Sequence, residues 1–189
     1  MSTLVLDNYD SFTFNLVHIL RELEVPHEVH RNDKIDVSEV EKFDRILFSP
    51  GPGIPSEAGH MPKIIETFIG NKPMLGICLG HQAIAEHLGG KIENMSKVYH
   101  GISTPIFQKE SSELFKDVPT EFEAGRYHSW KVSKENLPES IRITSEDEHG
   151  DIMSFDANGL KAFGIQFHPE SVMTPEGSKM IQNFVEIGK

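Results

Sequence analysis

The sequence is poor in cysteine and in positive charge, and it has no long apolar run. Cys78 is the only thiol among 189 residues, so the chain cannot form an internal disulfide. Its 18 basic residues face 29 acidic ones, and the net charge of -11 would repel phosphate backbones and anionic membranes. No apolar stretch approaches the roughly 20 residues needed to cross a bilayer, and the N-terminal residues lack the basic flank of a signal peptide. We therefore expect a soluble, cytoplasmic protein that binds neither nucleic acid nor membrane.

The first half of the chain alternates short apolar runs with helical patterns. Residues 3–6 form an apolar run, and Leu16, Leu20 and Leu23 then place one apolar stripe along a helix predicted for residues 11–23. Further strands are predicted at 28–30, 45–48 and 74–77, and further helices at 37–43 and 62–69. Such alternation predicts right-handed crossovers and a largely parallel sheet, with ligands at the carboxyl ends of its strands.

After Gly90 the pattern changes to short strand-like runs separated by turn residues. These runs occupy residues 91–94, 103–107, 129–132, 141–145, 152–156 and 162–167. A closing helix is predicted to begin at Pro175, with Thr174 as its N-cap, and to reach about Ile187. A chain of 189 residues is near the usual size of one domain. We predict a single-domain α/β fold with an open, mostly parallel sheet flanked by helices and with additional β hairpins.

Cys78 lies in a segment that predicts a strand, a sharp turn and a helix. Gly76 and Gly80 flank it as in the G-x-S-x-G nucleophile elbow, where small neighbours let a strained turn expose the nucleophile. The N-terminus of the following helix would favour the thiolate, and the N–H of Leu79 would bind a developing oxyanion. The alternative is a small buried apolar residue at the end of a central strand, which is what most lone cysteines are. A general base near the thiol would favour the nucleophile over the structural residue, so the sequence must be searched for one.

His168 and Glu170 follow the apolar run 162–167 and are the candidates for that base and its orienting group. Two residues apart in extended chain, their side chains face the same way, and Pro169 between them favours extended geometry. Glu170 could therefore fix the tautomer of His168 while the other ring nitrogen meets Cys78. The alternative is a surface His–Glu pair at the end of a strand.

Metal ligation is less favoured by the pattern. His27 with His30, and Cys78 with His81, are isolated pairs, and no second pair has the spacing that would complete a zinc site. We expect no metal.

The loop of residues 49–53, Ser-Pro-Gly-Pro-Gly, follows a predicted strand and should lie at the same edge of the sheet. Pro50 and Pro52 have no N–H, whereas Gly51 and Gly53 have an N–H and no side chain to obstruct close approach. Gly51 would be a second oxyanion donor opposite Leu79, although an ordinary turn has the same composition.

Taken together, these segments resemble the class I, triad-type glutamine amidotransferases over nearly the whole chain. The resemblance is carried by SPGPG followed by PSEAG, by GICLGHQ, by RYHS at residues 126–129 and by GIQFHPES at residues 164–171. More narrowly, LDNYDSFTFNL at residues 6–16 and Tyr-His-Gly at residues 99–101 are similar to the small subunits of anthranilate synthase and aminodeoxychorismate synthase. The implied unit is one type 1 amidotransferase domain spanning residues 1–189, with a flavodoxin-like fold.

The resemblance also implies a chemistry. Cys78 attacks the side-chain amide of glutamine, His168 protonates the departing ammonia, water hydrolyses the thioester, and Glu170 orients His168. Glutamine contacts are implied for Gly51, Pro52, Gly53, Gln82, Ser129 and Trp130. The family commonly has leucine where this chain has Trp130. The resemblance therefore implies a backbone contact at this position but does not define the rim of the glutamine pocket.

A partner is implied as well, because the larger subunit of these synthases binds chorismate and magnesium and receives the ammonia. No cofactor is expected on this chain, and the partner is component I of anthranilate synthase or of aminodeoxychorismate synthase. Its docking surface is expected around the mouth of the site, and aromatic and arginine side chains are favoured anchors there: Tyr99, His100, Arg126, Tyr127 and His128.

Three other classes of protein stay open. A fused purine or pyrimidine amidotransferase would need a further synthetase domain, for which 189 residues leave no room. A stand-alone γ-glutamyl hydrolase would use the same triad and would be indifferent to chorismate. A silent binding module would be expected to have lost a triad residue, whereas Cys78, His168 and Glu170 are all present.

Overall fold

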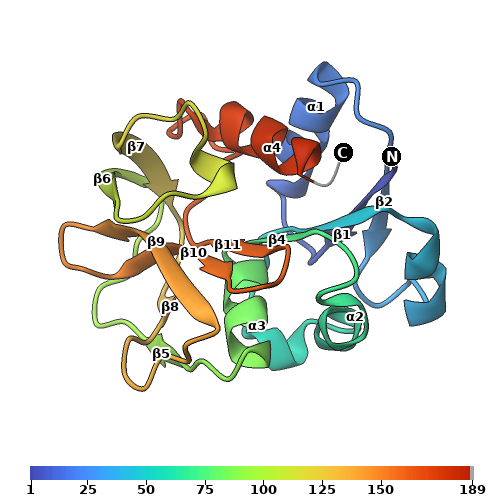
Figure 1. The fold of residues 1–189 in the computed structure, drawn as a ribbon, viewed down its shortest axis with the longest axis horizontal. Coiled ribbons are helices and arrows are strands. Elements are labelled where there is room, and N and C mark those ends of the chain that lie inside the picture. The colour runs from blue at the N-terminus through green and yellow to red at the C-terminus, as the bar shows by residue number, and fades with distance from the viewer. Residues whose placement is uncertain (188–189) are drawn as a thin grey trace.

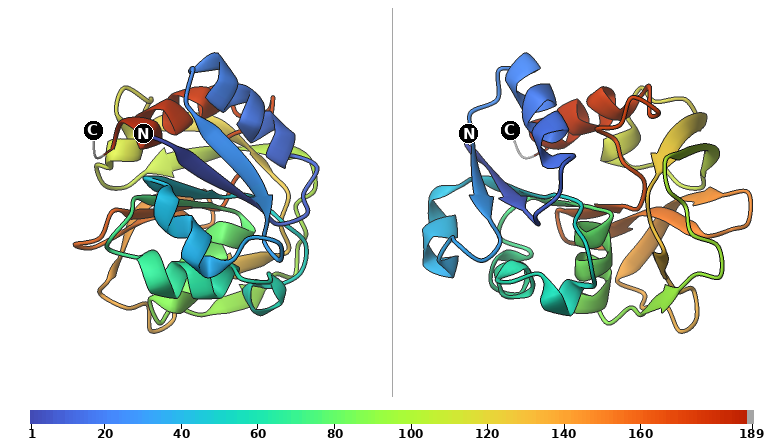
Figure 2. Two further views of the ribbon diagram at one scale, coloured as in Figure 1. Left: turned by 90° about the vertical axis from the view of Figure 1, so that its right-hand side faces the viewer. Right: turned by 180° about the vertical axis from the view of Figure 1, so that it is seen from behind.

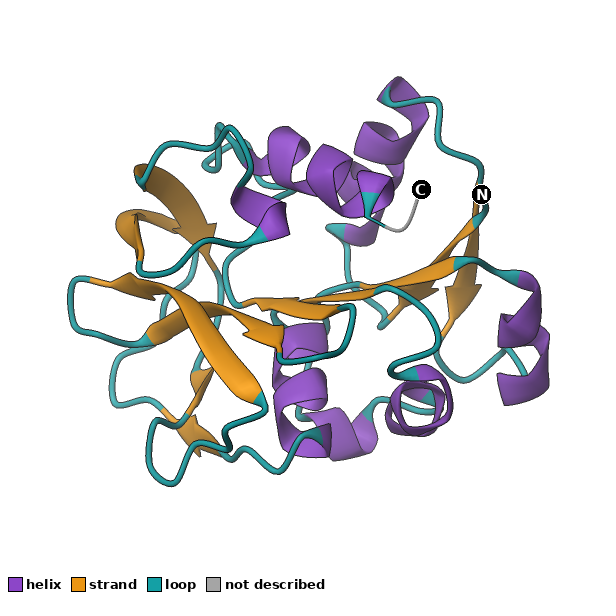
Figure 3. Cartoon of the chain, viewed as in Figure 1, coloured by secondary structure: helices purple, strands orange, loops and turns teal. Residues whose placement is uncertain are grey.

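The computed structural model describes residues 1–187 and has a nine-stranded mixed sheet at its centre (Figures 1 and 3). The strand order is β2-β1-β3-β4-β11-β10-β9-β6-β7. The parallel part consists of β1 (Thr3–Asp7), β2 (His27–Arg31), β3 (Arg45–Phe48), β4 (Met74–Ile77) and β11 (Ala162–Ile165). The antiparallel part adds β10 (Ile152–Ala157), β9 (Ile141–Asp147), β6 (Ile102–Gln108) and β7 (Glu121–Arg126). A small second sheet pairs β5 (Ile92–Asn94) with β8 (Trp130–Val132).

Helices cover both faces of the parallel part. Helices α1 (Thr13–Glu22) and α4 (Gly177–Glu186) lie on one face, and α2 (Met61–Phe68) and α3 (Leu79–His87) lie on the other (Figures 1 and 2). The 3-10 helices are η1 (Val37–Lys42), η2 (Pro55–Glu57) and η3 (Glu113–Phe115).

Strand alternation divides the apolar side chains between two cores. Leu4 and Leu6 of β1 enter the core beneath α2 and α3, whereas Val5 enters the core beneath α1 and α4. Consecutive residues thus serve opposite faces, as the pleat of a strand requires. A strand buried on both faces is read from its sequence as one continuous apolar run, which is why β1, β3 and β4 were predictable.

The predicted fold class is confirmed, with corrections in detail. Residues 37–42 form a 3-10 helix, with a capping box at Asp36, instead of an α-helix. Strand β7 was missed, since its buried positions include Gly125 and Arg126, which do not form an apolar alternation.

The closing helix was predicted to begin too early. It starts at Gly177, and Glu176 is its N-cap. The hydroxyl of Thr174 instead donates to the carbonyl of His168 at 2.7 Å and accepts from the N–H of Gly125 at 3.0 Å. Thr174 therefore ties the chain after His168 to strand β7 and does not cap the helix.

The carboxyl ends of the parallel strands meet at one edge of the sheet. Strand β4 pairs with β11 so that Ile77 lies opposite Ile165. The residues that follow these two positions, Cys78 and Gln166, are therefore neighbours although 88 residues separate them. Within residues 1–187, no helix has the combined length and apolar character that a membrane crossing needs.

Candidate active site

Cys78 occupies a strained turn between β4 and α3. Its backbone has φ 52° and ψ -99°, a conformation that residues with a Cβ rarely adopt. Neighbouring elements hold it there, since its N–H donates to the carbonyl of Ile165 at 2.8 Å and its carbonyl accepts from the N–H of Gln82 at 3.1 Å. Strain at a buried thiol points to a residue placed for chemistry and not for packing.

The two flanking glycines are required by close approach of the backbone. A Cβ on Gly76 would lie 2.3 Å from the carbonyl of Gly80, and a Cβ on Gly80 would lie 2.7 Å from the Cβ of Phe48. Real Cβ atoms do not come so close to other atoms, so both positions exclude every larger residue. The G-x-C-x-G pattern thus reflects how tightly α3 packs against β3 and β4 at the turn.

His168 and Glu170 form a buried pair just beyond β11. The Nδ1–H of His168 donates to Oε1 of Glu170 at 2.7 Å, and both side chains are almost wholly inaccessible to solvent. The backbone N–H of His168 donates to the carbonyl of Gly125 at 2.9 Å, which fixes the main chain from the side of β7. The rings of Phe12 and Tyr127 pack at 5.4 Å and 4.8 Å from the imidazole. Nε2 of His168 has no hydrogen-bond partner within residues 1–187.

The charge state of His168 depends on Cys78 and Glu170. Burial alone would lower the pKa of His168, but the sulfur of Cys78 and the carboxylate of Glu170 outweigh it and raise the pKa to about 10. The site therefore favours an imidazolium beside the sulfur of Cys78. An imidazolium can protonate a leaving group, and a cysteine acts as a nucleophile through its thiolate.

The pKa values of two neighbouring histidines are lowered instead of raised. Burial lowers the pKa of His81 to about 3. Burial and the adjacent Arg126 lower the pKa of His128 to about 4. Both are neutral near neutral pH, so His168 is the one of these three that can act as the acid.

A cavity of about 180 Å³ opens beside the sulfur, and we call it the Cys78 cavity. Its lining consists of Gly51, Pro52, Gly53, Cys78, Leu79, Gln82, Tyr127, His128, Ser129 and Trp130. All six residues predicted to contact glutamine are among them. The structure brings them together around the sulfur, and their contact with glutamine remains a prediction.

The two predicted oxyanion donors lie on neighbouring elements. Leu79 is the first residue of α3, so its N–H has no carbonyl of its own helix to reach. The backbone at Gly51 packs against the same residue, because a Cβ there would lie 2.8 Å from a methyl group of Leu79. Both residues line the Cys78 cavity, and their role as oxyanion donors remains a prediction.

The structure adds two residues that were not predicted for the site. Asn8 anchors the loop of residues 49–53, because its backbone N–H donates to the hydroxyl of Ser49 at 2.9 Å and its side chain donates to the carbonyl of Ser49 at 2.8 Å. Gln166 lies behind Cys78 and donates to its sulfur at 3.6 Å. Gln166 was detectable in principle, because it precedes His168 by the same two-residue step that separates His168 from Glu170.

Several residues predicted to contact a partner are interior residues of this chain. Arg126 is 1% exposed and pairs with Asp147 at 2.7 Å, while its guanidinium lies 3.6 Å from the centre of the Tyr99 ring. Tyr99 and His128 are also buried. In this conformation their side chains support the wall of the Cys78 cavity and do not reach the surface. His100 is exposed and Tyr127 is half-buried, so these two still fit the predicted surface.

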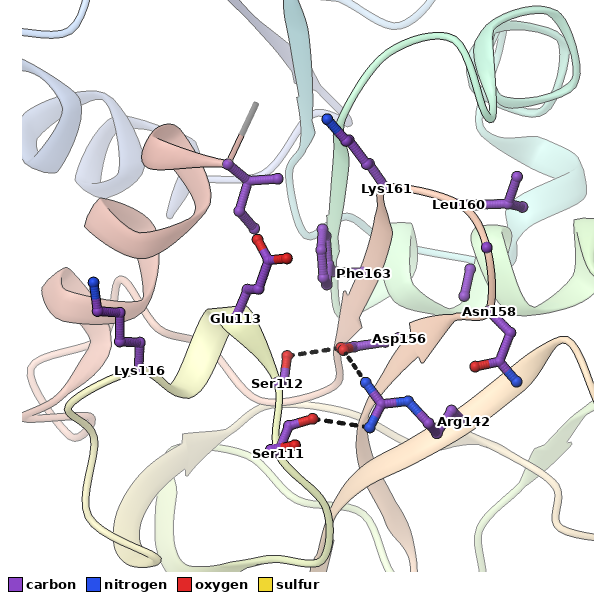
Figure 4. Close-up of a pocket in the computed structure, with 13 residues that line it drawn as sticks. Ser111, Ser112, Glu113, Lys116, Arg142, Asp156, Asn158, Leu160, Lys161 and Phe163 are labelled. Carbon is purple, nitrogen blue, oxygen red and sulfur yellow. Dashed lines mark hydrogen bonds and ion pairs between the residues drawn. The ribbon is translucent and has the colours of Figure 1, made fainter. Parts of the chain in front are cut away.

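A larger cavity, of about 560 Å³, lies at the opposite edge of the sheet, where β10 ends and β11 begins (Figure 4). We call it the Arg142 cavity, lined among others by Ser112, Arg142, Asp156, Asn158 and Lys161. Arg142 pairs with Asp156 at 2.7 Å, and Ser112 donates to the same carboxylate at 2.8 Å. Because Ser112, Arg142 and Asp156 already bond to one another, they leave little hydrogen-bonding capacity for a ligand, although this cavity is the larger of the two.

Comparison with known proteins agrees with this geometry. The family model "Glutamine amidotransferase class-I" matches residues 4–187. The chain is 41% identical to anthranilate synthase component 2 of Pseudomonas aeruginosa, over 96% of this chain and 94% of that one. It is 42% identical to aminodeoxychorismate/anthranilate synthase component 2 of Bacillus subtilis, over 97% and 95%. A Thermoplasma acidophilum structure, solved as that of a proposed GMP synthase component, superposes with a TM-score of 0.89 at 29% identity and covers 99% of this chain and 93% of that one.

Proposed function

Because this chain belongs to the class I glutamine amidotransferase family, we propose that it is the glutaminase component of a chorismate-using synthase. It hydrolyses L-glutamine and delivers the ammonia to a separate synthase subunit. The observation that carries the proposal is the strained Cys78 beside the buried His168–Glu170 pair, at the wall of a cavity that Gly51 and Leu79 also line.

The first half of the reaction releases ammonia. The thiolate of Cys78 attacks the side-chain carbonyl carbon of glutamine, a C–S bond forms, and the carbonyl oxygen becomes an oxyanion facing the N–H groups of Leu79 and Gly51. As the intermediate collapses, the C–N bond breaks and the imidazolium of His168 gives its proton to the nitrogen. Ammonia leaves, and a γ-glutamyl thioester remains on the sulfur.

The second half restores the site. His168, now neutral, accepts a proton from a water molecule that attacks the thioester carbonyl, and glutamate departs as the C–S bond breaks. Glu170 holds Nδ1–H throughout, so that Nε2 always faces the reacting atoms.

We propose anthranilate as the product of the complete synthase, with chorismate and magnesium bound by the partner subunit. The Pseudomonas aeruginosa relative is described as an anthranilate synthase component, which supports this choice. The Bacillus subtilis relative is described for both synthases, so aminodeoxychorismate is the second candidate. No cofactor is proposed for this chain.

The test is to titrate purified component I of either synthase into the chain and to follow glutamate release, with and without chorismate. We expect a weak basal rate that the cognate subunit raises at least roughly tenfold, equivalent to about 1.4 kcal/mol in the barrier. Anthranilate is then distinguished from aminodeoxychorismate by chromatography of the products. A full basal rate that neither subunit changes would instead identify a stand-alone γ-glutamyl hydrolase.

A further inference from the structure

Gln166 is a wholly buried polar residue that no step of the proposed reaction uses. It follows β11 directly, and its backbone N–H donates to the carbonyl of Met153 at 2.9 Å. Its side chain lies between Gln82 and Cys78. Oε1 of Gln166 accepts from Gln82 at 3.2 Å, and Nε2 donates to the sulfur of Cys78 at 3.6 Å. Gln166 does not line the Cys78 cavity itself, and it reaches the cavity only through its contacts with Gln82 and Cys78.

The direction of these hydrogen bonds is fixed by a backbone carbonyl. The carbonyl of Trp130 can only accept, and it lies 3.0 Å from Gln82, so the amide nitrogen of Gln82 must face it. That nitrogen is a donor, so Gln166 must turn its oxygen toward Gln82. The remaining end of Gln166 is its NH₂ group, which therefore points at the sulfur. Reversing either amide would place two donors or two acceptors face to face.

The Trp130 carbonyl is itself held from the other side. Nδ1–H of His128 donates to it at 2.8 Å, and Nε2 of His128 accepts from Arg126 at 3.1 Å. Arg126 in turn pairs with the buried Asp147. The orientation of Gln166 thus depends on a continuous buried chain of hydrogen bonds that begins at an ion pair.

We propose that Gln166 is a positioning residue for Cys78, which holds the sulfur and stabilises its thiolate by a donated N–H whose direction is set by Gln82 and the Trp130 carbonyl. Its contribution to turnover rests on the proposed function, whereas its effect on the thiol does not. A donor aimed at a thiolate is a charge-assisted hydrogen bond in a dry environment, where such bonds are at their strongest.

The test is the rate of alkylation of the intact chain by iodoacetamide as a function of pH. Because Cys78 is the only thiol, all modification reports on it. Gln166→Met keeps the length of the side chain and removes the donor. We expect the alkylation profile to move to higher pH by about one unit, a tenfold change in the thiolate equilibrium. In glutamine hydrolysis, kcat should fall by roughly tenfold.

Gln108→Met is the matched control. Gln108 also donates two hydrogen bonds, to the carbonyls of Val118 and Pro119, but it lies on β6 and has no contact with the Cys78 cavity. Its alkylation profile should coincide with that of the unmodified chain. If Gln166→Met does not fold, as judged by circular dichroism, Gln166→Leu replaces it, because this change also removes the donor to sulfur and adds no charge. A folded Gln166 variant whose alkylation profile coincides with that of the unmodified chain would overturn the proposal.

Alkylation requires neither glutamine nor a synthase subunit. A shifted profile in a chain that hydrolyses no glutamine, either alone or with component I of either synthase, would therefore uphold the role of Gln166 and refute the proposed function. The reverse result, glutamine hydrolysis with an unshifted profile, would refute the role of Gln166 alone.

Discussion

Two side-chain pairs near opposite edges of the sheet, Arg142–Asp156 and His168–Glu170, differ in how their polar atoms are satisfied. The charged groups of Arg142 and Asp156 are bonded to each other and to their neighbours. In the His168–Glu170 pair, Nε2 of His168 and Oε2 of Glu170 are buried and have no hydrogen-bond partner within the described part of the chain. The second pair thus retains hydrogen-bonding capacity that the first has used. A buried polar group without a partner is costly, so its presence beside Cys78 fits residues that are used in chemistry.

The largest effect is expected at the sulfur. Cys78→Ala should reduce glutamine-dependent synthesis by about 10⁶-fold, as loss of a triad nucleophile does, because no other thiol can replace it. Synthesis from added ammonium salt in the presence of the partner subunit should persist, because the partner performs that reaction. The measurement is product formation from each nitrogen source. Near-normal synthesis from glutamine would remove the chemical distinction between the two cavities.

The next effects separate the base from its orienting group. His168→Ala should lower kcat more than Glu170→Ala, because an unoriented imidazole still transfers protons whereas its absence leaves none to do so. In a serine triad the corresponding losses are roughly 10⁶-fold and about 10⁴-fold, and only their order should carry over. Turnover is measured on variants shown to be folded. The assignment of roles is reversed if Glu170→Ala proves the more damaging change.

A stability comparison uses one ion pair near each cavity. Arg126→Met strands the carboxylate of Asp147, whose side chain is 1% exposed, and should cost about 3–5 kcal/mol in the free energy of unfolding. Arg142→Met removes the same group from a pair in which the arginine is 32% exposed, and should cost about 1 kcal/mol. Urea denaturation measures both. Equal losses of unfolding free energy would show that the two ion pairs stabilise the fold to the same extent.

A pH dependence of stability is also expected at the Arg142 cavity. Burial, only partly offset by Ser112 and Arg142, raises the pKa of Asp156 from 3.8 to about 6. The fold therefore favours the protonated carboxyl, and this contribution is complete below the unfolded pKa and is lost as pH rises through the folded one. Relative to Asp156→Asn, the unmodified chain should lose about 2–3 kcal/mol of stability between about pH 4 and pH 7. Urea denaturation at several pH values tests this, and a pH-independent difference would contradict it.

Local patterns in the sequence were sufficient for the parallel half of the fold and for the triad candidates. Strands such as β4 are continuous apolar runs, and the flanks of Cys78 and the spacing of His168 and Glu170 are visible within a few residues. What could not be predicted depends on contacts between distant segments. Arg126 was assigned to the docking surface because arginine is a favoured anchor at interfaces, and only its pairing with the distant Asp147 explains its burial.

The same limit applies to the residues that support the nucleophile. Nothing local indicates that Gln166 contacts Gln82, or that Asn8 holds the loop after β3. The position of Thr174 was likewise read as a helix cap, because the sequence next to it cannot show that strand β7 and His168 compete for its hydroxyl.

The place of β11 in the sheet has a consequence for protein synthesis. This strand is almost the last element of the chain, yet it inserts between β4 and β10, near the middle of the sheet. A ribosome adding about 5–20 residues per second exposes the elbow of Cys78 several seconds before His168 has been made. During that interval the nascent chain has a thiol but no base. Incomplete and truncated chains are therefore unable to consume glutamine, and the enzyme becomes active only when its final segment closes the sheet.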